Sequence, residues 1–408
     1  AVEAAAKRPN ILFIMADDLG WMDLACQGNK LVETPNIDRL ARQGMRFTSA
    51  YAAAPVCSPT RAAVLTGQAP ARVHMTSHLP GQFFPKDNRP QPADMVPAIG
   101  PEHITIAERL MEAGYANAFL GKWHIAPSAG PQGKVAPGHS PLGQGFDINI
   151  GGCSYGGPPT FFDPYRIPFL KDRREGEYLP DRLADETITF MRQQVKAKKP
   201  FYVNLWPDDV HSPFWPPVDK WANGKRGLYH SVLEDMDRQL GKLFDVIRND
   251  EKLRDNTLVL VCSDNGPEQG AGSAGPFRGF KTHLYEGGIR SSLVVWGPGF
   301  VEKQNHVDRQ SVFSAIDLVP TLLDFTGTAI AVGATADVPL GPAGLPEGIG
   351  VEEDVVDRRG DGGVEDVPAR RRRPVGGVVR PVSGATDPVV HLGERTLVRF
   401  VTPALRTL

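Results

Sequence analysis

Short apolar runs alternate along the chain with segments of helical periodicity. The runs end in polar or turn residues, as strands buried on both faces do, and they cover residues 10–16, 200–206, 257–263 and 291–297. Two segments between them, residues 105–114 and 229–250, place apolar side chains at helical spacing, and the first ends at a glycine. This alternation predicts an α/β fold, with a large and mostly parallel sheet between helices. Ligands of such sheets bind where strands end and loops begin.

The composition narrows the class of protein. A chain of 408 residues can bury a large core, and its 45 basic and 47 acidic residues give no reason to expect nucleic acid or an anionic membrane as partner. No apolar run is long enough to span a bilayer. The first residue is Ala1, which is consistent with a processed export signal or with a trimmed chain, so we expect a periplasmic or secreted protein.

Acidic and amide residues follow two of the predicted strands. Asp17 and Asp18 come directly after the first strand, and Asp264 and Asn265 come directly after the third. Asp and Asn often end strands and begin turns, and either pair alone would favour that explanation. Two such pairs at equivalent strand ends instead predict a cage of hard oxygen ligands, which suits Ca²⁺ or Mg²⁺.

Cationic and imidazole groups also stand in candidate loops. Lys122 and His124 are two residues apart, so in an extended segment they would share a face. His211 follows the second strand, and Lys281 stands in a glycine-rich loop before the fourth. A lone histidine or lysine in a loop is usually just solvated. Beside a metal site these groups indicate an anionic substrate, with cations on its oxygens and histidines that move protons.

Several motifs then occur in a fixed order. Cys57-Ser58-Pro59-Thr60-Arg61 has the pattern C-x-P-x-R and continues as "AAVLTG", and "GYANAFLGKWH" places Asn117 where Thr or Ser is more usual. The segments "PNILFIMADDLGWMDL", "TPNIDRLARQGMRFTSAY", "SDNGPE" and "YEGGIRSSLVVWGPG" complete the set. Over residues 8–327 these motifs resemble the formylglycine-dependent sulfatases, which have an alkaline phosphatase-like fold.

The resemblance implies an activity and a maturation partner. In this family a formylglycine-generating enzyme oxidises the motif cysteine, here Cys57, to an aldehyde (3-oxoalanine). The aldehyde hydrate attacks the sulfur of a sulfate monoester and forms a covalent sulfoenzyme intermediate, from which sulfate is expelled as the carbonyl reforms. The expected substrates are sulfated sugars or glycans, with aryl sulfates as substrates in vitro.

The resemblance also implies the roles of single residues. Asp17, Asp18, Asp264 and Asn265, together with the modified Cys57, would ligate Ca²⁺, with Mg²⁺ as the other possibility.

The remaining expected positions would act on the hydrate and on the ester. Arg61 would orient the hydrate, and Lys122 would bridge the hydrate and the sulfate. His124 would be the base of the release step. His211 and Lys281 would hold the sulfate and protonate the leaving oxygen.

Some alternatives stay open at this point. Ser154 is either a further contact to the hydrate or a turn serine. Trp206, Asp208, Asp209, Phe214 and Trp215 either line a sugar subsite or belong to the packing around His211. Two functions are alternatives to sulfate ester hydrolysis. One is a phosphodiester or phosphonate monoester hydrolase on the same scaffold, and the other is a non-catalytic binder of sulfated glycans, which applies if Cys57 is not matured.

The end of the chain departs from the family pattern. We expect a catalytic domain over residues 1–330, followed by an atypical segment over residues 331–408 in place of the usual small antiparallel sheet. This segment holds ten arginines, no lysine and a single aromatic residue, Phe400. It lacks the large apolar side chains that offset the entropy of ordering. It is either a disordered or divergent tail or the product of a reading-frame error in GC-rich DNA.

Overall fold

The computed structural model describes residues 8–81 and 91–329. Within these residues nine strands form one sheet in the order β4-β3-β5-β1-β6-β7-β2-β8, and β9 pairs with β2. The strands are β1 (Asn10–Ala16), β2 (Met45–Tyr51), β3 (Ala116–Gly121), β4 (Ile148–Ile150), β5 (Phe201–Trp206), β6 (Thr257–Ser263), β7 (Arg290–Trp296), β8 (His306–Asp308) and β9 (Phe313–Ser314).

The helices of the described residues lie between the strands along the chain and after the last of them. They are α1 (Pro35–Gln43), α2 (Cys57–Thr66), α3 (Pro70–Val73), α4 (Ile106–Glu112), α5 (Leu179–Ala197), α6 (Gly224–Asn249), α7 (Glu251–Arg254), α8 (Glu286–Ile289) and α9 (Leu318–Phe325). Strand β7 runs antiparallel to its neighbours β6 and β2, whereas the other strand pairs are parallel. The predicted α/β class with a mostly parallel, mixed sheet is therefore confirmed.

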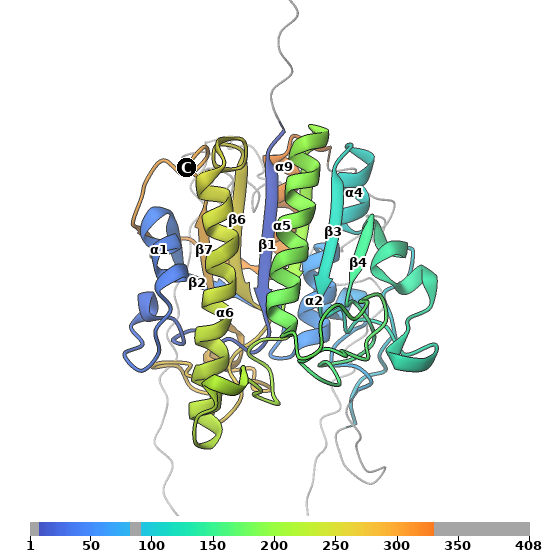
Figure 1. Ribbon diagram of the computed structural model, residues 1–408. Coiled ribbons are helices and arrows are strands. Elements are labelled where there is room, and N and C mark those ends of the chain that lie inside the picture. The colour runs from blue at the N-terminus through green and yellow to red at the C-terminus, as the bar shows by residue number, and fades with distance from the viewer. Residues whose placement is uncertain (1–7, 82–90, 330–408) are drawn as a thin grey trace, which may run out of the picture. The chain divides into compact units, whose positions relative to one another are not determined.

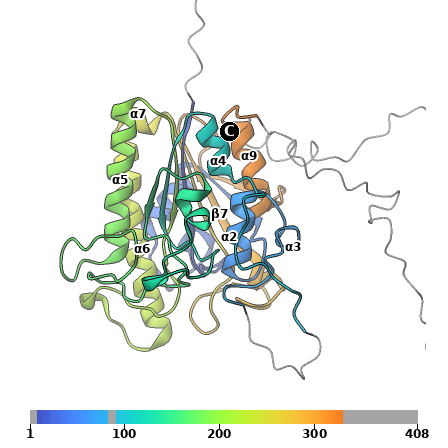
Figure 2. The same cartoon turned by 90° about the vertical axis from the view of Figure 1, so that its right-hand side faces the viewer.

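Helices cover both faces of the sheet (Figures 1 and 2). Helices α5 and α6 pack on one face, and α2, α4 and α9 pack on the other. Strand β1 shows why both faces are apolar, because Leu12 and Ile14 join the core under α5 and α6 while Ile11 and Phe13 join the core under α2. The sheet is thus buried on both sides, and its loops remain for chemistry.

The predicted elements agree closely with the observed ones. Strands β1 and β6 have the predicted bounds, and β5 and β7 differ from the predicted runs by one residue at their ends. Helix α4 begins after Thr105, whose hydroxyl accepts a hydrogen bond from the Glu108 N–H, and Gly114 follows its end at a φ of 85°. Helix α6 begins at Gly224, five residues before the predicted start.

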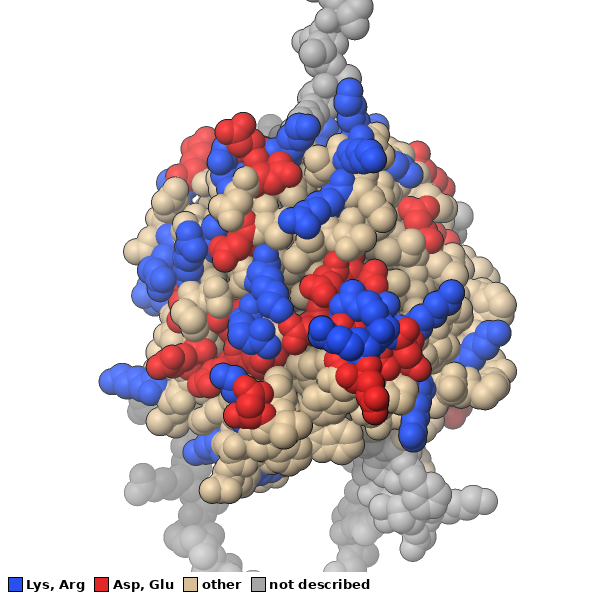
Figure 3. Space-filling view, in the orientation of Figure 1, with Lys and Arg blue, Asp and Glu red and all other residues tan. Residues whose placement is uncertain are grey.

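The boundary predicted at residue 330 stays a prediction, because residues 331–408 lie outside the described part of the chain. No helix among the described residues is long and apolar enough to cross a membrane. On the face that carries α5 and α6, positive and negative side chains alternate (Figure 3). Exposed ion pairs contribute to this pattern, such as Arg173 with Asp185 and Lys242 with Asp181. This face offers no patch of a single charge.

Candidate active site

The polar residues singled out in the sequence converge at one edge of the sheet. Asp17 and Asp264 follow the paired ends of β1 and β6, where the Asp264 N–H donates to the Ala16 carbonyl at 3.1 Å. The loop after β5 is tied to the same place, because the Asp17 N–H donates to the Asp209 carbonyl and the Val210 N–H donates to the Asp17 carbonyl. These bonds bring together strand ends that lie far apart in the sequence, as the topology of an α/β sheet predicts.

Three carboxylates and three cations form the centre of the site. Arg61 donates from Nε and Nη2 to Oδ2 of Asp264, at 3.1 and 2.8 Å. Lys122 Nζ lies 2.5 Å from Oδ2 of Asp17. Lys281 Nζ lies 2.7 Å from Oδ2 of Asp18.

The three carboxylates and three cations are largely shielded from water, so the net charge of the cluster decides which ligands it favours. The side chains of Asp17, Asp18, Asp264, Arg61 and Lys122 are 0% exposed. Because the acids and bases are equal in number, a divalent cation bound here would leave the cluster positive. That excess charge would favour an anionic ligand.

Cys57 is the first residue of α2, so it lies at the helix end that carries a partial positive charge. The residue is buried, and its Sγ lies 3.4 Å from Nδ1 of His124. Nε2 of His124 lies 2.8 Å from the Leu79 carbonyl oxygen. A carbonyl only accepts, so Nε2 donates and Nδ1 keeps its lone pair toward Cys57.

His211 stands on the other side of the carboxylates. Its Nδ1 donates to the Ser212 carbonyl at 2.5 Å, and its Nε2 lies 3.8 Å from Oδ2 of Asp18. Lys281 contacts the same oxygen of Asp18. An imidazole and an ammonium group therefore flank one carboxylate.

Burial and charge shift the pKa values of the whole cluster. Burial raises the pKa of Asp17, but Lys122, His211 and Arg61 outweigh it and hold the value far below normal. Burial and the charge of Asp17 raise the pKa of Asp18, and they raise that of Asp264 to about 6. The large and opposite shifts on neighbouring carboxyls are typical of functional sites.

The pKa values of the nucleophilic and basic groups are also shifted. Burial raises the pKa of the Cys57 thiol, so the side chain is a poor source of thiolate. Burial, reinforced by Lys122, lowers the pKa of His124 well below its usual value and that of His211 to about 4. Both imidazoles are thus neutral around pH 7.

The residues present fit a hard divalent cation. Oδ1 of Asp17 and Oδ1 of Asn265 are buried without a hydrogen-bond partner, which is costly for polar atoms. Asn265 Nδ2 donates to Oδ1 of Asp18 at 2.7 Å, and the Asp18 N–H donates to Oδ1 of Asp264 at 3.2 Å. One group of three acidic, histidine or cysteine ligands is found among the described residues: Asp17, Asp18 and His211, with ligand atoms within 4.8 Å of one another. Carboxylate and amide oxygens at this density suit Ca²⁺ or Mg²⁺.

Two expectations need adjustment. Lys122 and His124 both reach the site, but strand β3 ends at Gly121 and His124 has a φ of 53°, so a shared face of an extended segment is not the cause. Gly121 marks this end, since a Cβ there would lie 2.0 Å from the Trp206 carbonyl oxygen. The backbone N–H of Ser154 donates to the Gly133 carbonyl, and its contact to Cys57 stays a prediction.

The aromatic and acidic residues near His211 belong mainly to the packing. Trp206 and Asp209 are 0% exposed, Phe214 is 6% exposed and Asp208 is 8% exposed. Trp206 lies beneath the Arg61 guanidinium, 5.3 Å from it. These four side chains therefore belong to the packing. Trp215 is half-buried beside the ring of Phe161, and a sugar subsite there stays a prediction.

The sequence motifs did not reveal two residues that shape the site. The Ser58 hydroxyl bonds to the backbone of both His124 and Leu79. Gly156 lies against the His124 ring, where a Cβ would come within 2.8 Å of Cε1. The only sequence signal for Gly156 is its glycine pair with Gly157.

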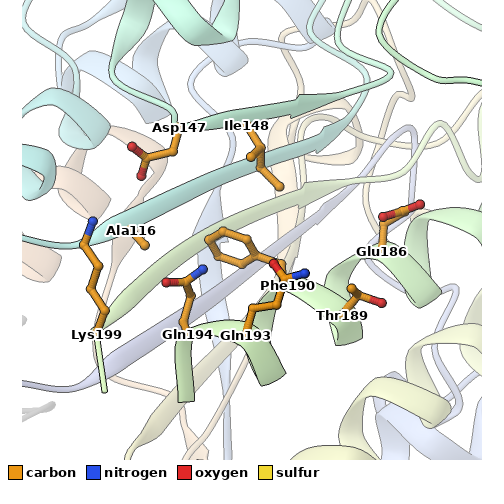
Figure 4. Close-up of a pocket in the computed structure, with 9 residues that line it drawn as sticks. All are labelled: Ala116, Asp147, Ile148, Glu186, Thr189, Phe190, Gln193, Gln194 and Lys199. Carbon is orange, nitrogen blue, oxygen red and sulfur yellow. The ribbon is translucent and has the colours of Figure 1, made fainter. Parts of the chain in front are cut away.

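A hollow of about 250 Å³ lies away from the candidate active site (Figure 4). Its lining comes from the first residue of β3, the start of β4 with the residue before it, helix α5, and Lys199, two residues before β5. These are the amino ends of the strands, opposite to the carboxyl ends that carry Asp17 and Asp264. The hollow shares no residue with the candidate active site and contains none of its charged pairs. It is lined by Ala116, Asp147, Ile148, Glu186, Thr189, Phe190, Gln193, Gln194 and Lys199.

Comparison with known proteins shows which fold and which family this architecture belongs to. The chain has the fold of a Vibrio parahaemolyticus protein in the alkaline phosphatase superfamily, with a TM-score of 0.52 and 22% identity over 80% of this chain and 68% of that chain. More narrowly, the family model described as Sulfatase matches residues 9–328, and the chain belongs to the sulfatase family. The resemblance read from the motifs is confirmed.

Two curated relatives and one solved structure are similar in sequence. N-acetylgalactosamine-6-sulfatase from Canis lupus familiaris is 33% identical over 80% of this chain and 63% of its own length. Arylsulfatase A from Homo sapiens is 32% identical over 80% of this chain and 66% of its own length. The structure named Ps i-CgsB in complex with k-i-k-neocarrahexaose has a TM-score of 0.68 and 29% identity, over 79% of this chain and 73% of that chain. The chain spans less than two thirds of the length of these curated relatives.

Proposed function

We propose that the protein hydrolyses sulfate monoesters of sugars or glycans, with Cys57 matured to formylglycine. The observation that carries this proposal is the convergence of Arg61, Lys122 and Lys281 on the carboxylates beside a cysteine at a helix N-terminus. Such a cluster suits an anionic, tetrahedral group, and family membership selects sulfate.

The chemistry of Cys57 supports maturation. A buried thiol with a raised pKa is a weak nucleophile, and its sulfated form would have no easy exit. The matured residue would supply a hydrate with one hydroxyl for attack on sulfur and a second for the release of sulfate. A formylglycine-generating enzyme is accordingly the proposed partner in maturation.

Asp17, Asp18, Asp264 and Asn265 would hold Ca²⁺, with Mg²⁺ as the alternative ion. The ion would supply positive charge beside the sulfuryl oxygens and would lower the pKa of the attacking hydroxyl. The two unpartnered buried oxygens, on Asp17 and Asn265, support these residues as ligands.

The remaining residues would hold the ester and move protons. Arg61, fixed by Asp264 and by the Lys122 carbonyl at 2.6 Å, would orient the hydrate. Lys122 and Lys281 would hold sulfate oxygens. His124 would take a proton at Nδ1 during release, because that nitrogen faces Cys57.

His211 would donate a proton from Nε2 to the leaving oxygen. Its pKa of about 4 means that it carries this proton at neutral pH only beside a bound anion, which adds negative charge next to the ring.

The substrate class rests on relatives that are named for amino-sugar sulfates and on the solved structure with a neocarrahexaose. A screen of sulfated monosaccharides, with nitrophenyl sulfate and aryl phosphate diesters alongside, tests the proposal. Preferred turnover of the phosphate diesters would instead identify a phosphodiester hydrolase. No turnover by fully matured protein would favour a glycan binder.

A further inference from the structure

The hydroxyl of Ser58 connects three segments that meet behind the His124 ring. Ser58 belongs to α2 and is 0% exposed. Its Oγ donates to the His124 carbonyl at 2.7 Å and accepts from the Leu79 N–H at 3.0 Å. One side chain therefore links the nucleophile helix, the loop after β3 and the segment that contains Leu79.

The bonds close into a ring that includes the imidazole. The Leu79 carbonyl accepts from Nε2 of His124 at 2.8 Å, while the Leu79 N–H is held by Ser58. The distance between Ser58 and Leu79 therefore sets where the acceptor for Nε2 lies. With the proton fixed on Nε2, the lone pair on Nδ1 is directed at the side chain of Cys57, 3.4 Å away.

The His124 backbone also needs this support. His124 has a φ of 53°, a conformation that non-glycine residues seldom adopt, and its carbonyl is the group that Ser58 holds. Gly156 also lies against the ring, where a Cβ would come within 2.8 Å of Cε1. Gly156 therefore limits displacement of the ring, while Ser58 holds the residue whose carbonyl accepts from Nε2.

We infer that Ser58 is a positioning residue, which fixes the tautomer and the orientation of His124 for the release of sulfate. This inference rests on the proposed function, in which Nδ1 of His124 takes a proton during release. The Ser58 hydroxyl bonds to the backbone of His124 and Leu79 and to none of the three cations of the site, so it acts through His124 and Leu79. Loss of its hydroxyl should slow release and leave the attack on sulfur unchanged.

The test compares Ser58→Ala with the matched control Thr66→Ala. Thr66 lies on the same helix, is also buried, and donates its hydroxyl to the Ala62 carbonyl, far from His124. Both proteins are expressed with a formylglycine-generating enzyme, and rates are expressed per mole of formylglycine. For Ser58→Ala, kcat for nitrophenyl sulfate should fall on the order of tenfold, because a misplaced group is costly in catalysis. The ratio kcat/KM should stay at the wild-type value, since it reports steps up to the attack.

A second measurement does not depend on turnover. The ¹⁵N NMR signals of His124 in the wild-type and control proteins should show a proton on Nε2 and none on Nδ1, whereas Ser58→Ala should show a mixture of tautomers. An equal loss of kcat and kcat/KM in Ser58→Ala, or an unchanged tautomer, overturns the inference. If wild-type protein hydrolyses no sulfate ester, the proposed function fails, and the NMR comparison still decides the role of Ser58.

Discussion

Removal of the Asp264 carboxylate should separate the electrostatic and metal-binding roles of the cluster. Asp264→Ala removes both hydrogen bonds that Arg61 donates to Oδ2, at 3.1 and 2.8 Å. The guanidinium stays fully buried and keeps the Lys122 carbonyl at 2.6 Å, with Asp17 at 3.7 Å. Breaking one side of a buried pair costs about 3–5 kcal/mol, and the remaining partners place this variant near 3 kcal/mol.

The assay is urea unfolding in EDTA and again in Ca²⁺. In EDTA, Asp264→Ala should lose about 3 kcal/mol of unfolding free energy, and Ca²⁺ should stabilise the wild-type protein but not the variant. The control is Asp185→Ala, which removes a half-exposed carboxylate paired with the half-exposed Arg173 and should cost at most about 1 kcal/mol. If Asp264→Ala binds Ca²⁺ like the wild type and unfolds like the control, the assigned role of Asp264 is wrong.

The other predictions concern turnover. His211→Ala should slow hydrolysis of sugar sulfates by about a hundredfold to ten-thousandfold and affect nitrophenyl sulfate far less, because only a poor leaving group needs the proton; equal losses would transfer the role of acid to Lys281. His124→Ala should slow both substrates alike and leave sulfate bound to the protein, as intact mass after quenching will report. Gly156→Ala should lower kcat on the order of tenfold to a hundredfold by displacing the His124 ring, whereas Gly157→Ala, where a Cβ meets nothing closer than 4.0 Å, should not; similar rates for the two variants would contradict this.

The sequence predicted the central strands well, since β1 and β6 are continuous apolar runs that end in the residues of the site. It predicted less of the outer sheet. Strands β4, β8 and β9 have only two or three residues each, and strand β2 mixes buried with partly exposed positions. None of these four strands therefore offers a long apolar run. Their pairing is decided by neighbouring strands and not by local pattern.

The charged residues of the site were predicted because each stands in a motif or directly after a strand. The supporting groups were not, because their roles depend on distant backbone atoms. Ser58 acts on Leu79 and His124, and Gly156 matters only because the His124 ring lies against it. The carbonyl that fixes the His124 tautomer carries no sequence signal at all.

In the proposed mechanism, hydrolysis of sulfate esters requires the conversion of Cys57 to formylglycine. The most direct measurement is the peptide mass of the Cys57 segment together with the turnover of nitrophenyl and sugar sulfates, in protein made with and without a formylglycine-generating enzyme. We expect activity to rise in proportion to the fraction of aldehyde or hydrate at Cys57 and to be absent from Cys57→Ala. Full activity in protein whose Cys57 is entirely an unmodified thiol would contradict this mechanism.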